Sequence, residues 1–244
     1  MKITKTLMAL CAALLLYPGA IGAEDYVYEE VVYQDVTGDK LKDRIILSGT
    51  FAEKDPQILT NVQLRIFVKS SKGYMEFDLA DGEKPKIAFT DINQDGNKDL
   101  LVTIHPMGET KEAIKGYALT VKDNKLIDLD MPDPVSIESS FNNGYTATLK
   151  VGEKSVVIDM KARKEQYEEL GLYHNGKLNE PMEMLIGPYS SLKPVYTVRG
   201  KGIEGIQKVS GASEDDLVGE IRSVWLMDQT GWKLEKVFFK ENVK

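Results

Sequence analysis

Alternation of apolar and polar residues is the most persistent pattern along this chain, and a period of two is typical of β-strands that bury one face. In residues 62–68 every second residue is aliphatic, while Gln63 and Arg65 point to the opposite face. Residues 75–79 alternate in the same way, as do the two halves of residues 145–160. The pattern therefore predicts a β-rich chain.

One helix and two connectors interrupt the predicted strands. Residues 161–170 are rich in helix-forming side chains and end before Gly171, which predicts a short helix. Residues 130–134 contain two prolines, and Gly187-Pro188 is followed by two serines, so both stretches predict irregular connections. The fold class that follows is all-β with one short helix.

An acidic loop, here called loop two, interrupts the alternation at residues 91–99 with the sequence DINQDGNKD. Oxygen-bearing side chains fall at its positions 1, 3, 5 and 9, and a glycine at position 6 permits a sharp turn. Calcium takes six to eight oxygen ligands, so this spacing predicts a calcium loop. An EF-hand is excluded because position 12 is Val102 and because both flanks alternate as strands. The alternative is a turn in which Asp and Asn hydrogen-bond to their own backbone.

A second acidic loop, loop one, lies 56 residues upstream at residues 35–43, with the sequence DVTGDKLKD. It has acids at positions 1, 5 and 9 and a threonine at position 3, while Lys40 replaces the glycine. Each loop is followed by a strand and a hairpin, which indicates repeated units that bury their apolar faces against one another. A degenerate third copy spans residues 196–204, where only Glu204 keeps an acid, so we expect the architecture there without the metal.

The acidic loop joined to a strand and a hairpin resembles the FG-GAP or VCBS-type repeat of extracellular β-propellers, including integrin heads. The layout is similar to that of small exported bacterial proteins with such repeats. The resemblance implies a partial or small β-propeller, with a β-sandwich-like packing as the alternative. In loop two it implies Ca²⁺ bound by the side chains of Asp91, Asn93, Asp95 and Asp99 and by the Asn97 carbonyl. In loop one it implies the side chains of Asp35, Thr37, Asp39 and Asp43 and the Leu41 carbonyl.

The N-terminus has the features of a secretory signal peptide. Lys2 and Lys5 precede an apolar core of 11 residues, too short to span a membrane, and Ala23 ends an acceptable cleavage site. We therefore expect residues 24–244 to be one β-rich domain, secreted or associated with the cell surface or wall. The single cysteine lies in the signal core, so the exported chain can form no disulfide.

The formal net charge of the chain narrows the classes of partner that it could bind. Removing the signal peptide takes away two lysines and no acid, so the formal net charge moves from −7 to −9. This balance argues against a nucleic-acid partner, which calls for a basic face, and it suits cation binding. No other long apolar run occurs, so we expect no membrane span. The partner would be an extracellular protein or glycan.

Candidates for catalysis are few. The chain has two histidines, His105 beside Pro106 and His174 in a predicted tight turn, and no familiar nucleophile or phosphate-binding motif occurs. Trp225 and Trp232 flank a turn, where they could stack on sugars, although core packing is the commoner role.

The expected function is a calcium-binding, non-enzymatic binding or adhesion module whose calcium ions order the inter-strand loops. The alternative is a secreted hydrolase, or an accessory to one, that acts on cell-wall or extracellular polysaccharide. A calcium buffer or sensor is a third possibility, but two loops give little capacity.

Overall fold

The computed structural model describes residues 27–108 and 113–242, so the predicted signal peptide lies outside the described residues. All recorded strand pairings are antiparallel, and one short α-helix is present. The prediction of an all-β chain with one short helix is therefore confirmed.

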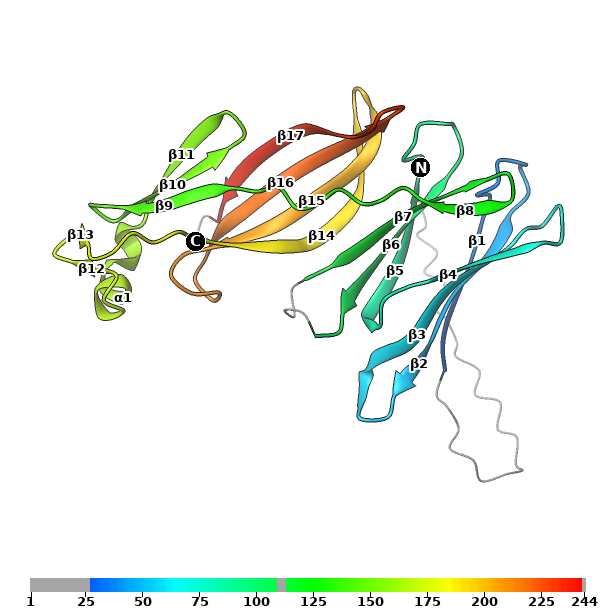
Figure 1. Ribbon diagram of the computed structural model, residues 1–244, viewed down its shortest axis with the longest axis horizontal. Coiled ribbons are helices and arrows are strands. Elements are labelled where there is room, and N and C mark those ends of the chain that lie inside the picture. The colour runs from blue at the N-terminus through cyan, green and yellow to red at the C-terminus, as the bar shows by residue number, and fades with distance from the viewer. Residues whose placement is uncertain (1–26, 109–112, 243–244) are drawn as a thin grey trace, which may run out of the picture.

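The chain builds three four-stranded units (Figure 1). Unit one contains β1 (Val27–Gln34), β2 (Asp43–Ala52), β3 (Asp55–Phe67) and β4 (Tyr74–Asp78). Unit two contains β5 (Gly82–Thr90), β6 (Asp99–Pro106), β7 (Lys115–Lys122) and β8 (Lys125–Asp128). Unit three contains β14 (Leu185–Thr197), β15 (Gly200–Ser210), β16 (Leu217–Asp228) and β17 (Gly231–Glu241). In each unit, consecutive strands pair as a meander.

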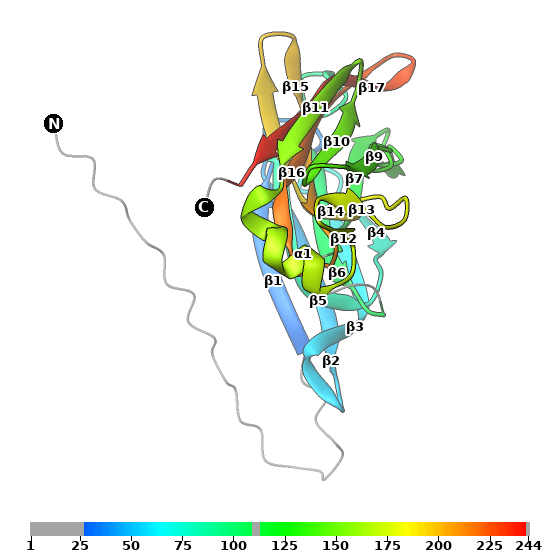
Figure 2. The same ribbon diagram turned by 90° about the vertical axis from the view of Figure 1, so that its left-hand side faces the viewer.

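An insertion separates units two and three. It contains a three-stranded sheet of β9 (Glu138–Asn142), β10 (Thr146–Val151) and β11 (Lys154–Asp159). A 3-10 turn (Lys161–Arg163) then leads into α1 (Lys164–Glu169) and the small hairpin of β12 (Tyr173–His174) and β13 (Lys177–Leu178). Figure 2 views the molecule from this end. The predicted hairpin and helix are both confirmed here.

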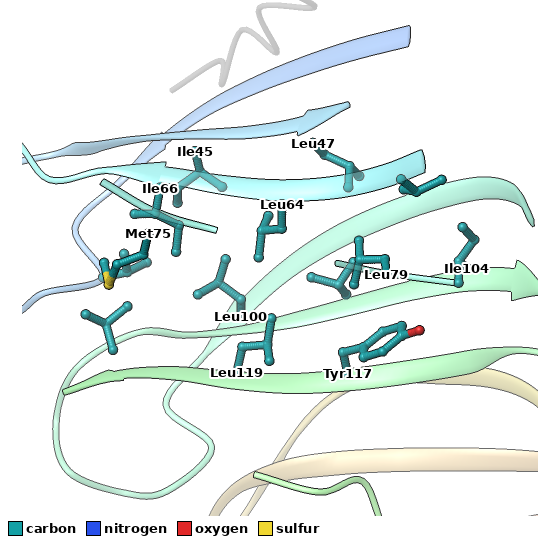
Figure 3. Close-up of a cluster of buried hydrophobic side chains, with 14 of the residues drawn as sticks. Ile45, Leu47, Leu64, Ile66, Met75, Leu79, Leu100, Ile104, Tyr117 and Leu119 are labelled. Atoms are coloured by element: carbon teal, nitrogen blue, oxygen red, sulfur yellow. The ribbon is translucent and has the colours of Figure 1, made fainter. Parts of the chain in front are cut away.

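The units pack face to face in a row. Units one and two formally share one eight-stranded sheet, but β3 and β5 meet at a single register pair, Leu59 with Gly82. Their apolar faces enclose one core, in which Leu64 lies opposite Leu100 and Leu119 (Figure 3). The alternation seen in the sequence builds this core, because alternate residues of each strand point into it.

The opposite face of unit two packs on unit three. Leu101 and Ala118 of unit two share a core with Tyr189 and Ile203 of unit three. The remaining part of that same face of unit three packs on the insertion, where Val209 and Ile221 join a cluster around Tyr167. The row thus has an open end at unit one, and within the described residues the sheets do not close on themselves.

Two local expectations are wrong. Gly187-Pro188 is not a connector, because β14 runs through it with register shifts between Ile186 and Ser191. Proline has no N–H to donate, and a strand tolerates it at such an irregularity. The third loop is also shorter than the aligned residues 196–204, since β14 and β15 are joined by a tight turn at Val198-Arg199.

The core between units one and two sets the first prediction. Leu64 is fully buried, so Leu64→Ala should lower the free energy of unfolding by about 2–5 kcal/mol through lost burial and the cavity left behind. Urea denaturation measures it. Val157→Ala, at a side chain 67% exposed, is the control and should change stability by less than about 0.5 kcal/mol. Equal effects of the two changes would contradict the described core.

Candidate metal loops

The two acidic loops occupy the same place in their units. Loop one joins β1 to β2 and loop two joins β5 to β6. Both carry positive φ angles at positions 4 and 6, namely 78° and 69° at Gly38 and Lys40, and 62° and 94° at Gln94 and Gly96. Lys40 therefore adopts the left-handed conformation that glycine adopts in loop two, so the missing glycine does not alter the path of loop one.

The loops also share their internal hydrogen bonds. The buried aspartate at position 9 accepts the backbone N–H of position 2, from Val36 to Asp43 at 3.2 Å and from Ile92 to Asp99 at 2.6 Å. The aspartate at position 5 accepts the backbone N–H of position 7, at 2.8 Å in both loops. Position 7 is Leu41 in loop one and Asn97 in loop two, the residues whose carbonyls the resemblance assigns as ligands. The two loops are thus structural repeats as well as sequence repeats.

In loop one, both oxygens of the position 1 and position 9 carboxylates accept hydrogen bonds. Asp35 accepts the amides of Gly38 and Lys40 at 2.7 and 2.8 Å. Asp43 Oδ1 accepts the Lys69 amide at 2.9 Å. Asp43 Oδ2, which accepts the Val36 amide, also accepts the Thr37 hydroxyl at 3.2 Å. Such a carboxylate is already stabilised without a metal.

The remaining acid of loop one, Asp39, is exposed. Hydrogen bonds from the Ser70 hydroxyl and the Leu41 amide lower the pKa of its carboxyl group. The ligand set that the resemblance implies for loop one stays a prediction. A calcium ion there would compete with these hydrogen-bond donors for the carboxylate oxygens.

Loop two differs at positions 1 and 9. Asp91 and Asp99 are 7% and 0% exposed, and one oxygen of each, Oδ1 in both, has no hydrogen-bond partner among the described residues. The hydroxyl of Thr90 is also buried without a partner there. Burial raises the pKa of Asp99, against the lowering effect of the Thr120 hydroxyl and of the Asn93 and Ile92 amides. A buried carboxylate oxygen without a donor is costly, and a bound cation would remove that cost.

The rest of loop two forms Asx-type turns. The side-chain oxygen of Asn93 accepts the Asp95 amide at 3.0 Å, and its Nδ2 donates to Asp95 Oδ2 at 3.0 Å and to the Thr120 hydroxyl at 3.2 Å. Among the residues the structure describes, no three Asp, Glu, His or Cys side chains are grouped closely enough to hold a metal. Binding a calcium ion would therefore require Asn93 and Asp95 to turn toward Asp91 and Asp99.

A lysine from unit three reaches into loop two. Lys201 Nζ, at the start of β15, lies 3.2 Å from Asp91 Oδ2, and the two side chains are 37% and 10% exposed. The Lys201 ammonium thus pairs with Asp91 Oδ2, whereas Asp91 Oδ1 has no hydrogen-bond partner among the described residues. Sequence analysis missed it, because the two residues lie 110 positions apart. The only sequence signal was that residues 196–204 align with the acidic loops.

The loops of the three units lie side by side at one rim of the row. A Cβ on Gly38 in loop one would lie 2.1 Å from Asn97 Oδ1 in loop two. A Cβ on Gly200, beside the turn of unit three, would lie 2.5 Å from Gln94 Oε1. The side-chain amide of Gln94 also donates to the Met227 carbonyl at 2.8 Å. Loop two is therefore held between its neighbours on both sides.

In unit three, the acid that aligns with position 9 of the acidic loops forms ion pairs. Glu204, 9% exposed on β15, lies 2.8 Å from Lys193 Nζ and 3.7 Å from Arg222.

The other candidates are spread over the molecule. His105 lies on β6 of unit two, whereas His174 lies on β12 in the insertion. Both tryptophans are half-buried, and their indole N–H groups donate to Ser223 and to the Leu129 carbonyl. They therefore pack within the fold instead of forming an exposed sugar platform.

Residues 135–240 match a family model described as the YybI C-terminal domain. The matched segment spans the insertion and nearly all of unit three, which share one core. It includes neither acidic loop. No curated protein and no solved structure matches the chain. Within residues 27–108 and 113–242, no helix has the length and apolar character that crossing a membrane requires.

The ion pair with Lys201 sets the second prediction. Lys201→Met should lower the free energy of unfolding in excess chelator by about 1–2 kcal/mol, between the values for exposed and buried pairs, because Asp91 loses its counter-charge. Urea denaturation at neutral pH measures it. Lys240→Met, at an exposed residue of β17, is the control. An increase in stability would show that the pair is not needed.

Proposed function

We propose that this protein is an exported, calcium-binding, non-enzymatic binding module. In this proposal its FG-GAP/VCBS-like units form a partial β-propeller, and a calcium ion in loop two orders their shared rim. The observation that carries the proposal is the pair of buried Oδ1 atoms of Asp91 and Asp99, which have no hydrogen-bond partner among the described residues.

The chemistry of loop two favours calcium over an ion-free turn. Two aspartates nine-tenths buried or more bring two negative charges into a region of low dielectric constant, and Lys201 pairs with only one of them, Asp91. Calcium tolerates irregular shells of oxygen ligands at 2.3–2.6 Å, whereas magnesium demands a near-ideal octahedron. Rotation of the Asn93 and Asp95 side chains would bring their oxygens to Asp91 and Asp99, and water would supply the remaining ligands. Extracellular calcium modules commonly bind at roughly 10⁻⁴ to 10⁻³ M, so export would supply enough ion.

The position of loop two gives calcium a structural role. The loop contacts loop one through Asn97 and unit three through Gln94 and Asp91. An ion that fixes this loop would therefore fix how neighbouring units meet, and with it the surface that the protein presents to a partner.

Paired substitutions at position 5 test the calcium proposal. Asp95 and Asp39 are both exposed and make the same hydrogen bond to position 7, so neither Asn variant should unfold the chain. Calcium at a hundredfold excess over its dissociation constant should stabilise the wild type by about 2.7 kcal/mol. Asp95→Asn should lose most of this effect, and magnesium should give less of it.

Isothermal titration calorimetry then counts the ions. One ion per chain in both the wild type and Asp39→Asn would place calcium in loop two alone. Two ions in the wild type and one in Asp39→Asn would place the second ion in loop one. No heat and no stabilisation at 10 mM calcium would refute the proposal.

The ammonium of Lys201 sets a further prediction. It neutralises part of the charge that calcium would neutralise, so the two cations should compete for Asp91. Lys201→Met should therefore raise calcium affinity by on the order of tenfold, a difference of about 1.4 kcal/mol. Calorimetric titration of the variant against Lys240→Met measures this, and unchanged affinity would show that Lys201 does not oppose the ion.

A further inference from the structure

An exposed row of side chains crosses the outer face of unit one, the face turned away from unit two. Strand register places Tyr33 of β1 opposite Arg44 of β2, Arg44 opposite Phe67 of β3, and Phe67 opposite Tyr74 of β4. We call these four residues the aromatic row. Since neighbouring strands lie about 4.8 Å apart, the row is about 14 Å long.

Three of the four members of the aromatic row, Arg44, Phe67 and Tyr74, stack on one another. The Arg44 guanidinium lies 5.7 Å from the centre of the Phe67 ring, and the Phe67 and Tyr74 rings are stacked at 6.0 Å with an angle of 27° between them. Tyr33 and Tyr74, at the two ends, are 58% and 62% exposed. Arg44, Phe67 and Tyr74 thus support one another, while the rings at both ends of the row stay open to solvent.

Four exposed lysines border this row at the loop-one end of the strands. Lys40 and Lys42 belong to loop one, and Lys69 and Lys72 belong to the turn between β3 and β4. The Lys69 amide donates to Asp43 at 2.9 Å, which ties the turn to loop one. We call these four residues the lysine rim. No ion pair is recorded for any of them within the described part of the chain.

The acids near the lysine rim are already engaged. Asp35, Asp39 and Asp43 accept hydrogen bonds from the backbone and hydroxyl groups of their own corner. Of the exposed acids on the outer face, Glu76 lies one row further from this end and Glu29 and Asp78 lie two rows further, and Glu29 is 3.7 Å from Arg44. The three aspartates of loop one keep their negative charge, so with Arg44 and the four lysines this corner carries a formal excess of two positive charges, in a chain of net charge −7.

We propose that the aromatic row and the lysine rim of unit one together bind an anionic polysaccharide. Sugar rings present C–H faces that pack on aromatic rings, and sulfate, carboxylate or phosphate groups along the chain would pair with the lysines. A polysaccharide fits better than a membrane, because two of the three rings are tyrosines, whose hydroxyl groups can hydrogen-bond to sugar hydroxyls, and the third lies beside the charged Arg44. This site combines the outer face of unit one with the loop-one corner, and none of its residues is a predicted calcium ligand.

Three soluble polymers separate the two contributions. Dextran sulfate carries sugar rings and negative charge, dextran carries the rings alone, and polyphosphate carries the charge alone. Binding of the purified protein is measured by biolayer interferometry at 50 mM salt in excess chelator, so the result is independent of loop two. We expect the affinity for dextran sulfate to exceed that for either other polymer by at least tenfold and to fall as salt screens the lysines.

Matched variants assign the site. Lys69→Gln with Lys72→Gln should weaken dextran sulfate binding at least fivefold, whereas Lys122→Gln with Lys125→Gln, on the equivalent hairpin of unit two, should not. Tyr74→Ala should weaken binding of dextran sulfate but not of polyphosphate. Tyr196→Ala, at an equally exposed tyrosine of unit three, should change neither. Circular dichroism of each variant verifies folding.

Three outcomes would overturn the proposal. The first is no binding of dextran sulfate at 50 mM salt. The second is equal binding of polyphosphate with no effect of Tyr74→Ala, which would mean attraction by charge alone. The third is tighter binding to vesicles of equal parts phosphatidylglycerol and phosphatidylcholine than to dextran sulfate, which would indicate a membrane surface.

Discussion

A buried aspartate at the start of the second strand anchors the first two units. Asp43 and Asp99 are both fully buried, and each accepts the backbone N–H of position 2 of its own loop. This hydrogen bond fixes where one strand ends and the next begins. A carboxylate can replace a missing strand partner for loop amides because it has lone pairs to spare. Unit three lacks this device and joins its first two strands by a tight turn instead. The same meander is thus reached by two kinds of connection.

Whether such an aspartate needs a metal depends on the donors around it. In loop one, the amide of Lys69 completes Asp43 through its Oδ1 atom, while among the described residues Asp99 Oδ1 in loop two has no recorded hydrogen bond. Two loops with the same backbone and similar sequences therefore present different electrostatic problems. The difference arises from residues outside the nine-residue loop, and the loop motif alone does not reveal it.

The strands, the hairpins and the helix were predictable because they follow local periodicity. Residues 62–68 alternate and all but the last belong to β3, and residues 161–170 contain α1. The error at Pro188 arose because a bulged strand can accommodate a proline, which depends on its partner strand. The nine-residue spacing located both acidic loops. It could not reveal Lys201 beside Asp91, or the row from Tyr33 to Tyr74, because these groupings depend on strand register and on contacts between units.

The contact between Lys201 and Asp91 also bears on how the chain folds. Strands pair with near neighbours in sequence, so each unit can form from contacts of low sequence separation, which favours rapid folding. The ion pair instead joins residues 110 positions apart, with the whole insertion between them. Closing so long a loop carries an entropic penalty that short hairpins avoid. We therefore expect units one and two to form before unit three docks onto loop two.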